Sequence, residues 1–425
     1  MTLKTNFCPS PWIHMKITHS GNFEFCRWAD QGTNINIRDC TPQEFFQTHM
    51  APIRADMLQG NPMQACHECH QMEQHHKVSG RQRQLLKTGV SIDSFEKSLR
   101  SSPYWPAFAA SHAQAGYTDV MPVDWQIDLG NYCNSACIYC APESSSRLAQ
   151  EFKKLKILKS EPVPTWANSA ELIDRLVHSL VSTPRLAYLH FLGGETLITP
   201  AFRIILEKLL AAGLNQVHIG FTTNLTVWDQ DIVDLLTQFK HVHLGMSVEC
   251  FHPVNDYVRW PSTITQIKDT AVQWIALGQQ HDWYMTMRVT PTALTIPYLT
   301  TVYDFAKQNR VGIESSNFLH NPECLKMSVL PQQYRRQLAD SIQSWIDRQN
   351  IQSSHQLINI RNPATLHLQI TQDAASYVDY LRTAPDESHR LPELVSYLKL
   401  LESSRSNSIL EYLPNYEPIL RSAGY

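Results

Sequence analysis

Two patterns of apolar residues alternate along the middle of the chain, one typical of strands and the other typical of helices. Short apolar runs predict strands at residues 125–129, 188–192, 216–221, 241–247, 283–289 and 311–315. Between these runs, apolar residues recur every three or four positions, which is typical of amphipathic helices. One such helix is predicted to begin at Thr199 and Pro200 and to end at Gly213, because these residue types favour the two ends of a helix.

Strands that alternate with helices predict an α/β fold with a parallel sheet and right-handed crossovers. A barrel of eight β/α units needs about 250 residues, and the alternating segment covers only residues 125–315. We therefore expect a partial (β/α)6 barrel. Functional groups in such folds collect on loops after the carboxyl ends of strands.

The remaining sequence suggests three further regions. Residues 1–90 are polar and rich in cysteine, which indicates a small separate domain. Residues 91–121 are rich in Ser, Pro and Ala and are interpreted as a linker or irregular cover, before a barrel at 122–325. Residues 326–425 have a helical pattern without a catalytic motif, so we expect them to form packing or a lid.

Composition narrows the class of protein. With 43% apolar and 18% charged residues, the chain can bury a large core and is not a disordered protein. A formal net charge of -3 does not favour binding to nucleic acid. No apolar run reaches the ~18–20 residues that span a bilayer, and the first residues lack the apolar core of a signal peptide. We therefore expect a cytoplasmic protein without nucleic-acid or membrane partners.

Ten cysteines in a cytoplasmic chain favour metal or catalytic roles over disulfides. Cys133, Cys137 and Cys140 lie within eight residues, directly after the first predicted strand. Thiolates at this spacing suit an iron–sulfur cluster, or zinc if a distant fourth ligand completes the site.

The motif Cys-x3-Cys-x2-Cys, with Tyr139 before its last cysteine, resembles the loop of the radical S-adenosylmethionine (SAM) superfamily. The resemblance implies that these three cysteines hold a [4Fe-4S] cluster whose open iron binds SAM. It also implies cleavage of SAM to a 5′-deoxyadenosyl radical, with the protein supplying position and exclusion of water.

Three later segments are similar to motifs of the same family and follow successive predicted strands: Gly193-Gly194-Glu195, Thr222-Thr223-Asn224 and Ser247-Val248-Glu249. A fourth similar stretch, Asn255-Asp256-Tyr257-Val258-Arg259, comes shortly after the third. By this resemblance, Tyr139, Gly193, Gly194, Glu195, Asn224, Ser247, Glu249 and Arg259 bind the cofactor. Glu195 is expected to accept a hydrogen bond from the SAM ammonium, and Arg259 to pair with its carboxylate. The chain departs from the family at Glu249, where Asp is usual, and at Cys250, where Gly is usual.

A second cysteine set is predicted in the first domain. Gly21 is expected to form a hairpin turn that places Cys8 and Cys26 on neighbouring strands, and Cys66-x2-Cys69 has metal-knuckle spacing. Four cysteines also fit a zinc ribbon. The segment looks like the Twitch module, a short relative of the SPASM domain that holds an auxiliary [4Fe-4S] cluster, here placed before the barrel. The implied ligands are Cys8, Cys26, Cys66 and Cys69, with Cys40 in reserve.

Cys250 and Cys324 belong to neither set, and each follows a predicted barrel strand. They are candidate catalytic thiols that would donate hydrogen to a substrate radical. The favoured interpretation is that each is a small apolar residue that fills space in the core.

The prediction is a radical SAM enzyme with two [4Fe-4S] clusters, reduced by an external one-electron donor such as flavodoxin or ferredoxin. The resemblance favours a peptide or protein side chain as substrate, with a net oxidation or cross-link preferred over epimerisation. One alternative is radical oxidation or rearrangement of a small molecule such as a sugar or aminocyclitol. Another is a zinc-binding adaptor without enzymatic activity.

Overall fold

The computed structural model describes residues 7–27, 29, 33–61, 63–74, 79–91, 94–314, 318–349 and 363–425. They form two compact units whose segments interleave along the chain. Unit 1 comprises Met1–Asn131, Val163–Gly220 and Asp231–His241, and unit 2 comprises Tyr132–Pro162, Phe221–Gln230 and Val242–Tyr425. The predicted boundaries after residues 90 and 121 therefore fall inside one compact unit.

Strands and helices alternate from β3 onward, which confirms the predicted α/β class with six successive β/α units. The strands of the described residues are β1 (His14–Ile17), β2 (Phe23–Glu24), β3 (Asp124–Asp128), β4 (Tyr188–Leu192), β5 (His218–Thr223), β6 (His241–Ser247), β7 (Tyr284–Arg288) and β8 (Gly312–Glu314). Each predicted strand overlaps one of β3 to β8. Ser315, the end of the last predicted strand, lies outside the described residues.

In unit 1 the strands are ordered β2-β1-β3-β4. Strand β1 pairs antiparallel with β2 and parallel with β3, where His14 lies opposite Asp124 and Ile17 opposite Ile127. Strands β3 and β4 are parallel. His14 and Met15 are successive residues, so their side chains point to opposite faces of β1, and both are fully buried. This pairing joins the amino-terminal segment to the predicted barrel strands.

Most helices of unit 1 lie in its amino-terminal part. They are α1 (Ser10–Ile13), α2 (Pro42–Glu44), α3 (Ala51–Gln59), α4 (His67–Gln74), α5 (Gly80–Lys87), α6 (Phe95–Ser101), α7 (Trp105–Ala113), α9 (Ala170–Val181), α10 (Pro200–Ala211) and α11 (Gln230–Leu236, whose first residue belongs to unit 2). Helix α10 has the predicted bounds, and Gly213 takes φ +76° beyond its end. The Thr199 hydroxyl donates to the Glu195 carbonyl and does not cap the helix.

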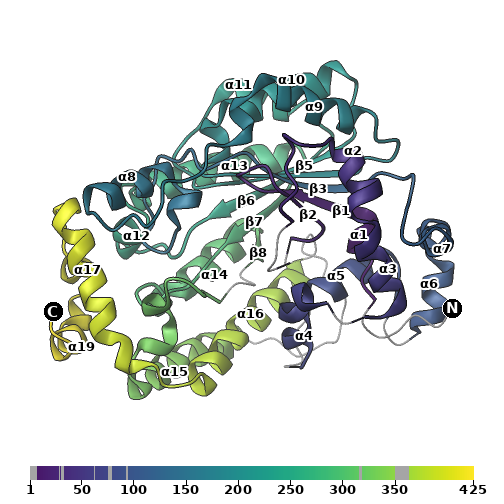
Figure 1. Ribbon diagram of the computed structural model, residues 1–425. Coiled ribbons are helices and arrows are strands. Elements are labelled where there is room, and N and C mark those ends of the chain that lie inside the picture. The colour runs from purple at the N-terminus through teal and green to yellow at the C-terminus, as the bar shows by residue number, and fades with distance from the viewer. Residues whose placement is uncertain are drawn as a thin grey trace. The chain divides into compact units, whose positions relative to one another are not determined.

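Unit 2 contains the parallel strands β6-β7-β8 and a helical carboxyl-terminal region, as predicted. Its helices are α8 (Ser146–Lys154), α12 (Val254–Val258), α13 (Ile264–Gln280), α14 (Leu299–Asn309), α15 (Gln332–Arg348), α16 (Pro363–Thr383), α17 (Leu391–Arg405), α18 (Ile409–Tyr412) and α19 (Glu417–Ser422). Helices α15 and α16 lie side by side (Figure 1).

Two local predictions were wrong. Residues 91–121 contain helices α6 and α7 where irregular structure was expected, because Trp105–Ala113 is rich in Ala and has Pro in its first turn. Cys8 does not lie on a strand, because the two prolines that follow it begin helix α1. The predicted turn at Gly21 is confirmed by φ +94° and by the β1–β2 pairing.

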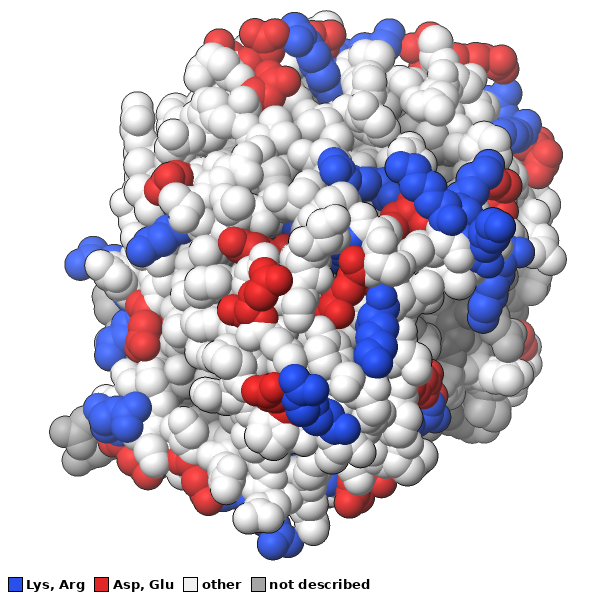
Figure 2. Space-filling model, turned by 90° about the vertical axis from the view of Figure 1, so that its left-hand side faces the viewer, with Lys and Arg blue, Asp and Glu red and all other residues white. Residues whose placement is uncertain are grey.

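The surface shows both signs of charge. On the face in Figure 2, acidic and basic side chains are intermixed, with a larger group of basic ones towards the upper right. Among the described residues, no helix combines the length and the apolar character that a membrane crossing needs.

Candidate functional site

The predicted cluster loop begins after β3, where the backbone makes a close turn. Gly130 has φ +115°, and a Cβ atom on it would lie 2.7 Å from the Thr165 side chain, so only glycine fits this turn. The Gly194 N–H donates to the Gly130 carbonyl at 2.7 Å. Gly193 also lies close to this carbonyl, since a Cβ atom added to Gly193 would be 3.1 Å from the Gly130 carbonyl oxygen. The predicted glycine pair therefore packs two backbones closely within unit 1.

Backbone hydrogen bonds hold the cysteine loop within unit 2. The Ala136 N–H donates to the Trp260 carbonyl at 2.7 Å, and the Ile138 N–H donates to the Val258 carbonyl at 2.9 Å. The Asn224 amide adds a side-chain tie, because it donates to Asn134 Oδ1 at 2.8 Å. Asn224 was predicted to bind the cofactor, and the structure brings it to the loop that carries the three cysteines.

The three thiols of this loop share one electrostatic environment. Burial, together with the neighbouring Cys137 and Cys133 thiols, raises the pKa of Cys140 to about 12. Cys137 is buried, while Cys133 and Cys140 are half-buried. Three thiols on one loop have the ligand chemistry that an iron–sulfur cluster uses. Their side chains are not placed around a common metal position, because among the described residues no three His, Cys, Asp or Glu side chains are arranged to hold a metal ion.

Three predicted cofactor residues form a buried network with one another. The Tyr139 hydroxyl donates to the Glu249 carboxylate, and Arg259 Nη1 lies 2.9 Å from Glu249 Oε1. The Thr290 N–H donates to Glu249 Oε2 at 2.6 Å. Burial raises the pKa of Glu249, while the Arg259 guanidinium opposes the rise. The network connects Tyr139, the residue before Cys140, to the loop after β6.

We expect Arg259→Met to lower the free energy of unfolding by about 3–5 kcal/mol, because it leaves the Glu249 carboxylate buried without its cation. Adding Glu249→Gln should restore part of that loss, because a neutral amide needs no counter-charge. Urea unfolding of both single variants and the double variant measures this coupling.

Arg288→Met is the matched control for that experiment. Arg288 pairs with Glu314 at 2.9 Å, but these side chains are 26% and 38% exposed. A pair this accessible to water contributes about 0–1 kcal/mol. Additive costs at Arg259 and Glu249 would contradict a coupled buried pair.

The remaining predicted site residues are Glu195, Ser247, Cys250 and Cys324. In unit 1 Glu195 is 1% exposed, and its carboxylate accepts from the Leu197 N–H at 3.2 Å. Ser247 is the last residue of β6. Cys250 and Cys324 are both buried, and Cys324 lies in a short 3-10 helix at Glu323–Leu325. Roles for these residues in SAM binding or hydrogen transfer stay predictions.

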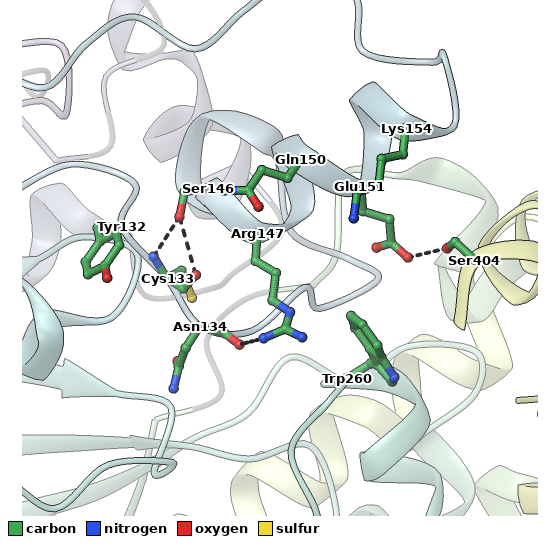
Figure 3. A pocket seen from close by; sticks show the side chains of 10 residues that line it. All are labelled: Tyr132, Cys133, Asn134, Ser146, Arg147, Gln150, Glu151, Lys154, Trp260 and Ser404. Atoms are coloured by element: carbon green, nitrogen blue, oxygen red, sulfur yellow. Dashed lines mark hydrogen bonds between the residues drawn. The ribbon is translucent and has the colours of Figure 1, made fainter. Parts of the chain in front are cut away.

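A pocket of about 300 Å³ lies beside Cys133 within unit 2. Its wall includes Arg147, which donates to the Asn134 carbonyl at 3.2 Å and lies 4.8 Å from the centre of the Trp260 ring. Figure 3 shows the Arg147 side chain extending from α8 towards Asn134 and Trp260, with Glu151 and Ser404 to the right of it. Sequence reasoning had no signal for this pocket, because its residues come from four distant segments.

The predicted second set of cysteines converges on one cavity in unit 1. Cys8, Cys26, Cys66 and Cys69 all line it. Burial, together with the neighbouring Cys26 and Cys69 thiols, raises the pKa of Cys66 to about 12. Thiolates are the ligand type of zinc and iron–sulfur centres, so the four cysteines that line this cavity have the chemistry of a metal centre. Burial, Glu44 and Asp39 raise the pKa of the reserve residue Cys40 to about 11, while Arg175 opposes the rise.

Arg81 gives this cavity a positive side that the sequence analysis did not assign. It pairs with Glu73, lines the cavity, and donates to the Phe7 carbonyl at 3.2 Å. The N–H groups of Gly80 and Arg81, in the first turn of α5, lower the pKa of Cys69 against its burial. The capping box of Ser79 and Gln82 was the available sequence signal for this helix start.

An aromatic core supports the same cavity. Phe7, Trp12 and Phe108 pack with ring centres 5.2–5.4 Å apart, and Cys8 belongs to their cluster. The Trp12 indole donates to Ser111 at 2.7 Å, which ties α7 to this core.

Comparison with known proteins identifies the class of the central segment. Residues 127–290 match the Radical SAM superfamily, which confirms the predicted radical SAM domain over this part of the chain. The matched segment contains Cys133, Cys137 and Cys140.

Individual relatives match more distantly. Sporulation killing factor maturation protein SkfB of Bacillus subtilis (strain 168) is 20% identical over 181 residues, which are 41% of this chain and 39% of that protein. The chain thus spans about two fifths of this curated relative's length. The structure of Streptococcus suis SuiB bound to S-adenosylmethionine aligns with a TM-score of 0.35 at 11% identity, covering 82% of this chain and 71% of that one. SuiB bound to the precursor peptide SuiA aligns with a TM-score of 0.34 at 11% identity, covering 75% and 65%.

Proposed function

We propose that the chain is a radical SAM enzyme that holds a [4Fe-4S] cluster on Cys133, Cys137 and Cys140. The observation that carries this proposal is the cysteine loop itself, which lies inside the matched segment with its three thiols in one environment. Bound there, a reduced cluster with SAM would supply a 5′-deoxyadenosyl radical for hydrogen abstraction from a substrate, and a second cluster would accept one electron from the resulting substrate radical.

The chain's own residues have three tasks in this proposal. The ties at Ala136 and Ile138 fix the loop, and the Tyr139–Glu249–Arg259 network fixes the residue next to Cys140. Glu195 and Asn224 are proposed to orient SAM. Cys8, Cys26, Cys66 and Cys69 are proposed to hold the second cluster, because they line one cavity with Arg81.

We further propose a peptide substrate and a net oxidation or cross-link. The maturation role in the name of SkfB supports the peptide. Cys250 and Cys324 are buried, which supports oxidation over an epimerisation that needs a thiol donor at the substrate. A loss of two hydrogens balances if one leaves as a hydrogen atom in 5′-deoxyadenosine and the other as a proton, with the last electron accepted by the second cluster. An external one-electron donor, of the flavodoxin or ferredoxin type, reduces the first cluster.

The deciding experiment uses the full chain purified without oxygen and reconstituted with iron and sulfide. We expect about eight iron and eight sulfide per chain, as two [4Fe-4S] clusters require. Dithionite with SAM should then give 5′-deoxyadenosine, measured by chromatography and mass spectrometry. Two zinc ions per chain and no 5′-deoxyadenosine would contradict the proposal and support a zinc-binding adaptor.

A further inference from the structure

The residues on either side of Cys137 are held from two directions. Their N–H groups donate to the backbone of residues 258–260, as described above. Their carbonyls accept from α17, since Arg405 Nη2 donates to the Ala136 carbonyl at 2.7 Å and the Tyr397 hydroxyl donates to the Ile138 carbonyl at 2.7 Å. These two donors come from residues 269 and 259 positions later in the chain.

Arg405 is itself fixed by a buried ion pair. Its Nε and Nη2 lie 2.8 Å and 2.6 Å from the two carboxylate oxygens of Glu151, and the two side chains are 0% and 8% exposed. Ser404 donates to the same carboxylate at 2.6 Å, a bond drawn in Figure 3. The bidentate ion pair fixes the orientation of the guanidinium. The position of the Ala136 carbonyl therefore depends on the position of α17.

Glu151 also connects α17 to the cysteine loop through α8. At the start of α8, the Cys133 N–H donates to Ser146 Oγ at 3.1 Å, and the Ser145 hydroxyl donates to the Ser135 carbonyl at 2.6 Å. The first half of the loop thus rests on α8 and its cap, and the second half rests on α17.

Hydrophobic packing of α17 against the cysteine loop would not require the Tyr397 and Arg405 hydrogen-bond donors. Ala136 and Ile138 are fully buried, so their carbonyls need partners that stay in place. An amphipathic helix that only covered the loop would contact it with apolar side chains, whereas α17 contributes a phenol and a guanidinium to two specific carbonyls.

We propose that α17 positions Cys137 for cluster binding, with Tyr397 and Arg405 as positioning residues. The carboxyl-terminal region is then part of the cluster site and more than packing or a lid. This inference rests on the proposed function, because it treats Cys137 as a cluster ligand.

Tyr397→Phe tests the inference because it removes one hydroxyl and keeps the ring. Tyr416→Phe is the matched control, since Tyr416 also donates its hydroxyl to a backbone carbonyl, that of Ala293 at 2.6 Å, and lies in the same region. The first readout is the alkylation rate of the Cys137 thiol in cluster-free protein, followed by peptide mass spectrometry. Cys69 is the internal reference because it is buried in unit 1.

We expect Tyr397→Phe to speed alkylation of Cys137 about fivefold, the local opening expected from one lost hydrogen bond. Tyr416→Phe should leave that rate unchanged, even if both variants lower the thermal midpoint equally. In reconstituted protein that carries Cys66→Ala and Cys69→Ala, a chelator should remove iron about fivefold faster from the Tyr397→Phe variant, by the same loss.

Arg405→Lys gives a second route to the same conclusion. Lysine keeps the charge opposite Glu151 but cannot bridge both carboxylate oxygens and the Ala136 carbonyl in one plane. It should therefore also speed alkylation of Cys137. Equal rates in the wild type, Tyr397→Phe and Arg405→Lys would overturn the positioning role. A wild-type loop that takes up no iron would instead overturn the proposed function, and the alkylation rates would still show whether α17 holds Cys137.

Discussion

Replacing Cys133, Cys137 and Cys140 with Ala is expected to abolish the formation of 5′-deoxyadenosine from SAM. The three thiols act on one another electrostatically on a loop whose backbone is held by hydrogen bonds, and their replacement removes every proposed ligand of the first cluster. Iron should fall by about four per chain, the content of one [4Fe-4S] cluster. Anaerobic assay with dithionite, together with iron analysis, measures both quantities.

Cys40→Ala is the matched control for this triple variant. Cys40 is also a buried thiol, but Glu44, Asp39 and Arg175 are the charges that act on it. Its replacement should leave both iron and 5′-deoxyadenosine unchanged. Normal 5′-deoxyadenosine from the triple variant would remove the basis of the proposed function, and loss of activity in Cys40→Ala would show that the assay reports folding.

The sequence was sufficient for features that depend on local pattern. Periodicity predicted the strands β3 to β8, and the order of short motifs after them predicted the radical SAM domain that the comparison confirms. Gly21 and Gly213 have the positive φ that a turn and a helix end require. Each of these signals lies within a few residues of the structure that it specifies.

Features that depend on distant pairing were not predicted. Strand β1 was assigned to a separate module, but it pairs with β3, and His14 and Asp124 are 110 positions apart. The sequence marks neither partner, because a short buried strand has the same apolar pattern in any sheet. The donors from α17 to the cysteine loop could not be predicted for the same reason. A tyrosine and an arginine on a helix carry no sequence signal that names their distant partners.

The predicted network residues illustrate a third case. Motif order singled out Tyr139, Glu249 and Arg259 as ligands of SAM, and the structure joins them to one another. Resemblance identified the residues that matter, but the geometry assigns them at least one task that the motif does not describe. Glu249, one methylene longer than the usual Asp, reaches both Tyr139 and the Thr290 N–H.

Cys66→Ala together with Cys69→Ala is expected to remove the second cluster and leave the first. Iron should fall by about four per chain, while dithionite with SAM still gives 5′-deoxyadenosine. The physical reason is that all four thiols line one cavity of unit 1, so the loss of two leaves too few ligands for a cluster. The Cys133, Cys137 and Cys140 loop belongs to unit 2 and keeps its own ties.

Metal analysis of this double variant also decides between iron–sulfur and zinc at the cavity. The Arg81 guanidinium and the first turn of α5 favour negative charge beside Cys66 and Cys69, and this suits either metal centre. A fall of one zinc per chain with no change in iron would assign a zinc site to this cavity. Unchanged iron and zinc would show that the ligand assignment is wrong, and Cys40→Ala, analysed beside it, should retain the full metal content. With a substrate present, loss of the second cluster should stop the two-hydrogen oxidation while 5′-deoxyadenosine still forms. The reason is that the substrate radical then has no acceptor for the one electron that it must lose.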